Sequence, residues 1–368
     1  MFFYDIPNLL AIIIVVSVSF RIGLVPLWLS FFLILFSFTP FFLNDVLFPA
    51  TYMPDQFQYY EATQRLRDFN FEPIGNSNLK VNVSNWLLAT IPLPYIETIK
   101  SLGFFNRLIA TILIIWLYSS KNLRGWPLLL ILFYPSFLLY SSLALRDTLV
   151  LVFMIFAVIF YIEKRMLMAL LVSLPLAIIK FQNFFLVITY FVIHSYFTKG
   201  SLIYKYRYIL LVMILAVLVP FILTIIEYVD YYRYALFIED GGRSSSYVQI
   251  KTFGEFTVAA LQSAPYFLMK PLPWEADSFL QIIQSFENFL ILLFLIFIFL
   301  KAYKVDKSVA LKWFVYLLAA FSIYGLVIYN FGTAVRYKFP FIMIIVIGIA
   351  YELYLKYDHL ILNKSKRI

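Results

Sequence analysis

Residues 279–300 read FLQIIQSFENFLILLFLIFIFL, and this stretch decides the fold. A helix that crosses a membrane needs about 20 mostly apolar residues, because its backbone must satisfy its own hydrogen bonds in hydrocarbon. The stretch meets that requirement with a single charged residue, Glu287. It therefore predicts a transmembrane helix. A carboxylate at that depth is functional by default, so Glu287 is a candidate binding residue, with an intramembrane ion-pair partner as the alternative reading.

The whole chain has the same apolar character. Hydrophobic residues make up 63% of its 368 residues and charged residues 13%, against about 45–50% and about 25% in soluble domains. This composition excludes a soluble globular domain, a disordered chain and a nucleic-acid-binding domain. We expect an all-α, polytopic integral membrane protein that forms one domain over residues 1–368. About 11 transmembrane helices are predicted, at 6–20, 23–43, 99–118, 126–143, 148–162, 166–179, 183–197, 208–226, 279–300, 312–329 and 338–355.

Basic residues orient these predicted helices. Alternating connections place 16 of the 29 Lys and Arg residues with four acids on one side, for a net charge of +12. The other side carries 13 basic and 16 acidic residues, a net charge of −3. The positive-inside rule makes the first side cytoplasmic, which puts the N-terminus outside and the C-terminus inside. Two long external loops follow, 44–98 and 227–278, an arrangement compatible with a GT-C-like architecture.

The second external loop contains an apolar piece, Phe253–Met269, with Glu255 and Pro265 inside it. We predict an interfacial or re-entrant helix here, because a twelfth span would place the basic C-terminal tail outside.

Cations near the external ends of the predicted helices are candidates for anion binding. Arg146, Arg243 and Arg336 are three of them, and Lys270 is a fourth. Guanidinium groups bind phosphate oxygens bidentately. Glycines beside Arg243 and Arg336 would let backbone N–H groups approach an anion. The set predicts a site for a lipid-linked phosphate or diphosphate, and the alternative for each residue is snorkelling or an ion pair with a nearby acid.

External carboxylates supply candidates for a catalytic base. Asp55 and Glu275 are those that we favour, in that order, because a carboxylate can accept the proton of an attacking sugar hydroxyl. Tyr59 would share a helix face with Asp55 at i, i+4. Tyr59 and Trp274 are predicted to stack on sugars. The alternative for Asp55 is a helix-capping role.

Other kinds of catalysis find little support in the sequence. The chain has no Cys, which excludes a disulfide framework and a thiol nucleophile. His194 and His359 lie outside the external loops, so a Ser–His–Asp arrangement is unsupported. No HExxH, GxGxxG or Walker motif is present. No clustered ligand set indicates a metal, and we expect neither a metal nor a cofactor.

Four segments together resemble the Wzy-type polysaccharide (O-antigen and exopolysaccharide) repeat-unit polymerases of bacterial surface-glycan clusters. They are DQFQYY at 55–60, the stretch from Tyr134-Pro135-Ser136 to Arg146-Asp147, KPLPWE at 270–275 with Glu287 downstream, and NFGT at 330–333 with Arg336 and Pro340. The chain departs from the related O-antigen ligases, which use an external His.

The resemblance implies an enzyme of the bacterial inner membrane with an active site that faces the exterior. It would transfer a growing glycan from undecaprenyl diphosphate to a sugar hydroxyl of an incoming lipid-linked repeat unit. Arg146, Arg243 and Arg336 would bind the diphosphate, with Arg146 and Arg336 also stabilising charge on the leaving group. The implied partners are lipid-linked glycans, membrane lipid and a chain-length regulator, without nucleic acid.

Two alternatives stay open. One is a GT-C-type glycosyltransferase that uses a polyprenyl-phosphate sugar, a class that also places an acidic residue in the first external loop. The other is a flippase or transporter of lipid-linked oligosaccharides. Transporters usually show internal repeats, and none is visible here.

Overall fold

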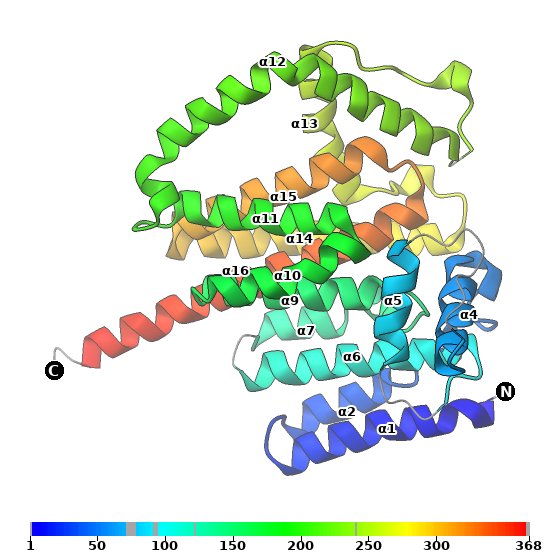
Figure 1. Ribbon diagram of the computed structural model, residues 1–368. Coiled ribbons are helices and arrows are strands. Elements are labelled where there is room, and N and C mark those ends of the chain that lie inside the picture. The colour runs from blue at the N-terminus through cyan, green and yellow to red at the C-terminus, as the bar shows by residue number, and fades with distance from the viewer. Residues whose placement is uncertain (1, 71–78, 91–94, 121–122, 240, 366–368) are drawn as a thin grey trace. The chain divides into compact units, whose positions relative to one another are not determined.

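The computed structural model describes residues 2–70, 79–90, 95–120, 123–239 and 241–365, and these residues form α-helices joined by short connections (Figure 1). Within these ranges there is no strand, and one isolated bridge joins Asn44 and Phe48. The predicted all-α class is confirmed. The chain divides into two compact units, Met1–Val187 and Ile188–Ile368, and each is described here by itself. The single domain expected from the sequence stays a prediction.

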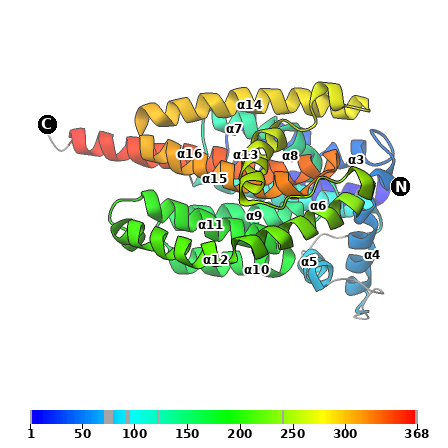
Figure 2. The same ribbon diagram turned by 90° about the horizontal axis from the view of Figure 1, so that it is seen from above.

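Unit 1 is a stack of helices in which α1 packs on α2 and α6, and α6 packs on α9 (Figure 1). Its described helices are α1 (Phe2–Arg21), α2 (Leu27–Phe36), α3 (Thr39–Leu43), α4 (Asp55–Arg67), α5 (Leu79–Ala89), α6 (Ile99–Ser119), α7 (Trp126–Leu132), α8 (Pro135–Tyr140), α9 (Asp147–Ile162), α10 (Met166–Ile179) and the first part of α11 (Phe181–Phe197), with the 3-10 turn η1 (Ala50–Tyr52). The pair α4 and α5 stands steeply across the other helices of the unit (Figure 2).

Unit 2 is centred on α15, which packs against α12, α13, α14 and α16. Its helices are the last part of α11, α12 (Leu202–Glu239), α13 (Phe253–Met269), α14 (Phe279–Val305), α15 (Lys307–Val327) and α16 (Phe331–Ser365), with the 3-10 turns η2 (Ser244–Ser246) and η3 (Pro273–Glu275). Figure 2 shows α14, α15 and α16 side by side. The bounds of α13 are those predicted for the interfacial piece of the second loop.

Five of the described helices are long and apolar enough to cross a membrane: Phe3–Arg21, Ile99–Ser119, Phe279–Val305, Lys307–Val327 and Phe331–Lys356. A sixth span arises if α11 and the start of α12 count as one, although their axes bend by 107°. The chain is therefore a helical membrane protein. The 16 residues of α9 and the 14 of α10 would extend about 24 and about 21 Å, which is short of a hydrocarbon core of about 30 Å.

Two of the expected spans are broken into shorter helices. The run 23–43 forms α2 and α3, and the run 126–143 forms α7 and α8. Proline explains the second break, because Pro135 begins α8 and has no N–H for a continuous helix. The expected span 208–226 lies inside the longer α12, so the helix continues 13 residues into the region predicted as external loop.

Candidate functional site

The connection between α8 and α9, residues 141–146, lies against α6 in the interior of unit 1. Gly103 of α6 permits this approach, because a Cβ atom at that position would lie 2.4 Å from the carbonyl oxygen of Ser142. One turn further on, Asn106 Nδ2 donates hydrogen bonds to two carbonyl oxygens of the connection, those of Leu143 and Leu145, at 2.6 Å each. We call residues 141–146 the 141–146 segment. It is held in place by the polar face of α6.

Arg107 follows Asn106 on α6 and is fully buried. Its Nη1 donates to Ser141 Oγ at 3.0 Å. The guanidinium carbon lies 5.9 and 6.0 Å from the ring centroids of Phe36 and Phe137, which is within the range of cation–π attraction. Its Nε and Nη2 are buried and have no hydrogen-bond partner among the described residues. Two strong donors of a buried cation are thus left without acceptors.

Arg146 stands at the other end of the same segment, as the N-cap residue of α9. Its Nε and Nη1 are also buried without a hydrogen-bond partner in the described part of the chain, and so is Ser142 Oγ. Buried polar groups in native proteins almost always have partners, and an uncompensated buried charge costs several kcal/mol. Two such guanidinium groups on one segment indicate a site that an anion completes.

The nearest ion pair does not supply that anion. Asp147, the first residue of α9, accepts a salt bridge from Lys180 Nζ at 3.4 Å, and both side chains are buried. These two charges compensate each other. No carboxylate of the described residues forms a salt bridge with Arg107 or Arg146. The site therefore keeps an excess of positive charge.

An acidic cavity of about 240 Å³ lies at the start of α6 in the same unit. Asp5, Asp45 and Glu97 line it, together with Tyr60 and Lys100. Lys100 forms a salt bridge with Asp45 at 3.9 Å. The cavity is smaller than the about 300–1,000 Å³ typical of drug-sized ligands, so it suits a compact polar group such as one sugar ring.

The walls of this cavity are tied to α6 and α4 by polar side chains. Asp5 accepts hydrogen bonds from Thr98 Oγ1 at 2.9 Å and from Ser101 Oγ at 2.6 Å. Tyr60 donates its hydroxyl to the carbonyl oxygen of Glu97 at 2.8 Å. Burial, and then the charge of Glu97, raises the pKa of Tyr60. The phenol therefore stays protonated at neutral pH and acts as a donor.

Gln56 connects the cavity to the 141–146 segment. It exchanges two hydrogen bonds with Asn44, a residue of the cavity wall, at 3.0 and 3.1 Å. Its Oε1 also accepts the backbone N–H of Ala144 at 3.2 Å. The predicted base Asp55 is the half-buried first residue of α4, directly before Gln56, and the predicted stacking residue Tyr59 is buried one turn later. Unit 1 thus brings Asp55, Tyr59 and Arg146 into one hydrogen-bonded region.

The other predicted site residues belong to unit 2. Lys270 is buried at the end of α13, and its Nζ donates to the carbonyl oxygen of Ile328 at 3.2 Å. Lys338 of α16 is buried beside it and donates to the carbonyl oxygens of Leu268 and Lys270 and to Asn288 Oδ1, at 2.9, 3.0 and 2.5 Å. These contacts join α13 to α14, α15 and α16. The role predicted for Lys270 at a diphosphate stays a prediction.

Glu275, Glu287 and Trp274 lie on or beside this junction. Glu275 accepts hydrogen bonds from Tyr266 Oη at 2.9 Å and from the backbone N–H of Leu272 at 3.0 Å. Glu287 is buried on α14, where its charge acts on Lys338. Trp274 is 80% exposed, as a sugar-stacking or interfacial side chain would be.

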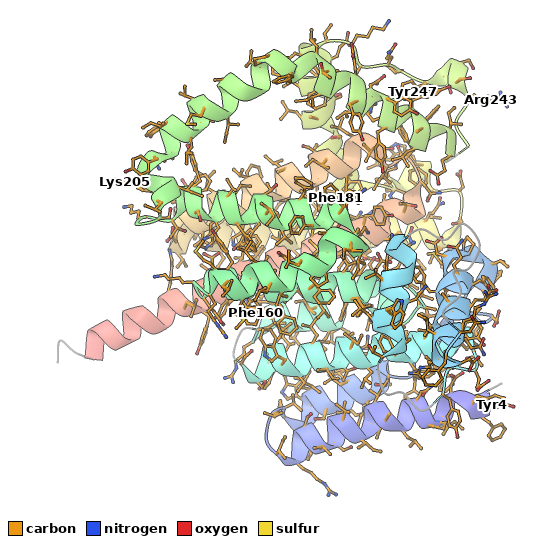
Figure 3. All side chains as sticks on the ribbon, viewed as in Figure 1. Tyr4, Phe160, Phe181, Lys205, Arg243 and Tyr247 are labelled. Carbon is orange, nitrogen blue, oxygen red and sulfur yellow. The ribbon has the colours of Figure 1, made fainter. Side chains whose placement is uncertain are left out.

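Arg243 and Arg336 differ in their surroundings. Arg336 is half-buried in the second turn of α16, with its guanidinium carbon 6.0 Å from the ring of Tyr337. Arg243 is exposed at the tip of the loop between α12 and α13 (Figure 3). The base of that loop is fixed by Asp230, whose Oδ1 accepts from Arg233 Nη1 at 3.1 Å, Tyr247 Oη at 2.8 Å and the N–H of Ile250 at 2.9 Å.

Sequence reasoning missed Arg107, Asn106 and Gln56 as parts of the site. A signal for the first two was present, because Gly103, Asn106 and Arg107 recur at i, i+3 and i+4 inside an otherwise apolar span. Gln56 carried no such signal, since its importance depends on a contact with Ala144, far away in the chain.

No protein-family model matches the chain, and neither a curated protein nor a solved structure matches it. Among the described residues no group of three or more His, Cys, Asp or Glu side chains could hold a metal ion. The function must therefore be argued from the residues of the site.

Proposed function

We propose that this chain is a Wzy-type polymerase of lipid-linked glycan repeat units, with Arg107 and Arg146 of unit 1 as ligands of the diphosphate. The observation that carries the proposal is the pair of buried guanidinium groups along the 141–146 segment, each with two donors that lack a partner in the described part of the chain. A diphosphate offers many acceptor oxygens and a compensating charge, and guanidinium forks match that geometry.

The proposed topology has 11 spans in the bacterial inner membrane, with the N-terminus and the site on the exterior side. The five long apolar helices support the spanning character, and the division of charge into +12 and −3 supports the orientation. Under this topology the first residues of α4, α6 and α9 all lie at the outer surface, as does the acidic cavity.

The chemistry assigns one task to each part of the site. The hydroxyl oxygen of the acceptor sugar attacks the anomeric carbon of the donor, and the bond from that carbon to the diphosphate oxygen breaks. Undecaprenyl diphosphate leaves with the electron pair, and its charge is stabilised by Arg107 and Arg146. A carboxylate takes the hydroxyl proton, a role that we assign to Asp55. The acidic cavity would hold a sugar through Tyr60 and its carboxylates.

Substitution of the two arginines tests the proposal. Arg107→Gln and Arg146→Gln should each lower glycan transfer by about 10²–10³, the size expected for loss of one charge-stabilising donor. The measurement is turnover of purified protein with an undecaprenyl-diphosphate-linked repeat unit, combined with the glycan ladder of a complemented deletion strain. Arg165→Gln is the matched control, because that guanidinium is largely exposed and pairs with Glu163 at 3.7 Å. Normal ladders in both site variants would overturn the proposal.

A second candidate is a transferase that uses a polyprenyl monophosphate sugar. The acidic cavity between α1 and the start of α6 favours it, because that class relies on a carboxylate in the first external loop. Donor choice separates the two candidates. Turnover with the monophosphate donor and none with the diphosphate donor would establish the second one.

A further inference from the structure

The bend between α11 and α12 gathers cations and tyrosines at one point of unit 2. The two helix axes meet there at 107°, and Lys205 lies at the tip of the bend (Figure 3). The bend is tied internally, since Ser201 Oγ donates to the carbonyl oxygen of Ser195 at 2.5 Å and accepts the N–H of Tyr204 at 2.9 Å. The cluster is therefore a built feature of the turn.

Arg207 is the centre of this cluster. Its guanidinium carbon lies 4.3 Å from the ring centroid of Tyr204, 4.8 Å from that of Tyr208 and 5.8 Å from that of Tyr196. Its Nη2 donates to Tyr208 Oη at 3.0 Å. Lys205 is exposed, with Nζ 5.1 Å from the ring of Tyr206. The rings orient the guanidinium without neutralising it.

No acidic side chain balances these charges. The chain contains no Asp or Glu from residue 164 to residue 226, although Lys199, Lys205 and Arg207 lie in that range. Among the described residues none of the three forms a salt bridge. The cluster therefore presents a local positive field.

The helix that leaves the cluster is apolar and open on every side. Leu211, Val212, Met213 and Ile214 are consecutive and each is 46–64% exposed. Four consecutive residues at 100° per residue cover the whole circumference of a helix. Figure 1 shows this part of α12 standing away from α11. In a membrane protein, acyl chains cover such a surface.

We propose that the bend binds an anionic phospholipid, with the headgroup phosphate on Lys205 and Arg207 and the acyl chains along the first turns of α12. Tyrosines favour the boundary between headgroups and hydrocarbon, and basic residues at that boundary attract anionic lipids. The apolar surface beside the charges selects a phospholipid over a soluble acidic protein. This site is separate from the proposed catalytic residues and does not depend on them.

Native mass spectrometry of the full-length protein in detergent tests the proposal, with phosphatidylglycerol and phosphatidylcholine of identical acyl chains as probes. The wild type should bind phosphatidylglycerol at least about tenfold more tightly. Lys205→Gln with Arg207→Gln should reduce the preference to within about twofold, because each cation near a membrane surface contributes about fivefold. Lys301→Gln with Lys304→Gln removes the same charge from α14 and is the matched control.

A second pair of variants tests the ring cage and protects against misfolding. Tyr204→Leu with Tyr208→Leu keeps the charge and should weaken phosphatidylglycerol binding by several-fold, while Arg207→Lys should fall between wild type and Arg207→Gln. Equal losses in the α14 control, equal binding of both lipids by the wild type, or displacement of the lipid by inorganic phosphate or an acidic protein would each overturn the proposal.

Discussion

Single residues decide whether the interior of unit 1 can bring its charges together. Gly103 is one of them, because α6 and the 141–146 segment touch through backbone atoms at that point. A larger side chain would push away the segment that presents Arg107 and Arg146. The placement of the guanidinium groups thus rests on an atom that is absent.

We predict that Gly103→Ala destabilises the protein by about 1–3 kcal/mol, the usual size of an overpacking effect. The added Cβ would sit 2.4 Å from the carbonyl oxygen of Ser142, and a backbone oxygen cannot move aside as a flexible side chain can. Thermal unfolding in detergent measures the change. Gly254→Ala is the control, since a Cβ there meets nothing within 4 Å, and it should leave stability unchanged or raise it by up to about 1 kcal/mol. Equal effects at both positions would contradict the prediction.

At the scale of elements, the start of α13 shows how a helix in an otherwise apolar protein is fixed at its polar end. Thr252 Oγ1 accepts the N–H of Glu255 at 3.2 Å, and Glu255 Oε2 accepts the N–H groups of Lys251 and Thr252 at 2.8 and 3.2 Å. This reciprocal pattern is a capping box. It explains why α13 begins where the sequence predicted.

The same cap makes the stability of α13 depend on pH. Hydrogen bonds from the backbone of Lys251 and Thr252 lower the pKa of Glu255. A lowered pKa means a contribution that is present above the unfolded-state pKa and is lost as pH falls through the folded-state pKa. We expect wild type to exceed Glu255→Gln in stability near pH 7 and to converge with it in acid. Unfolding of both proteins between pH 3 and pH 7 measures this, and a constant difference would exclude the charge as its cause.

At the scale of the whole chain, the division of charge predicts which connections face outside. We expect Ser245→Cys, in the loop between α12 and α13, to react with a membrane-impermeant maleimide in intact cells. Lys304→Cys, at the end of α14, should react only after permeabilisation. The chain has no native Cys, so each variant carries one reactive thiol. Labelling of both positions in intact cells would contradict the proposed orientation.

Hydropathy predicted much of the helical fold and little of the site. The expected span 99–118 is α6, 166–179 is α10, and 148–162 is α9 without its first residue. Hydropathy could not see the break at Pro135, because the residues on both sides of it are equally apolar. Arg146 was identifiable as a cation at a helix end. Its unpartnered donors were not, since the lack of a partner is a property of three-dimensional packing.

The short helices α9 and α10 have a consequence for the membrane around unit 1. If their common turn at Lys164 and Arg165 lies at one water boundary, their other ends stop about 6–9 Å below the opposite one. Arg146 and Lys180 stand at those ends. The bilayer must thin there, or water must enter a depression above them. A charged group drawn into that depression leaves the bulk solvent without leaving the outer leaflet.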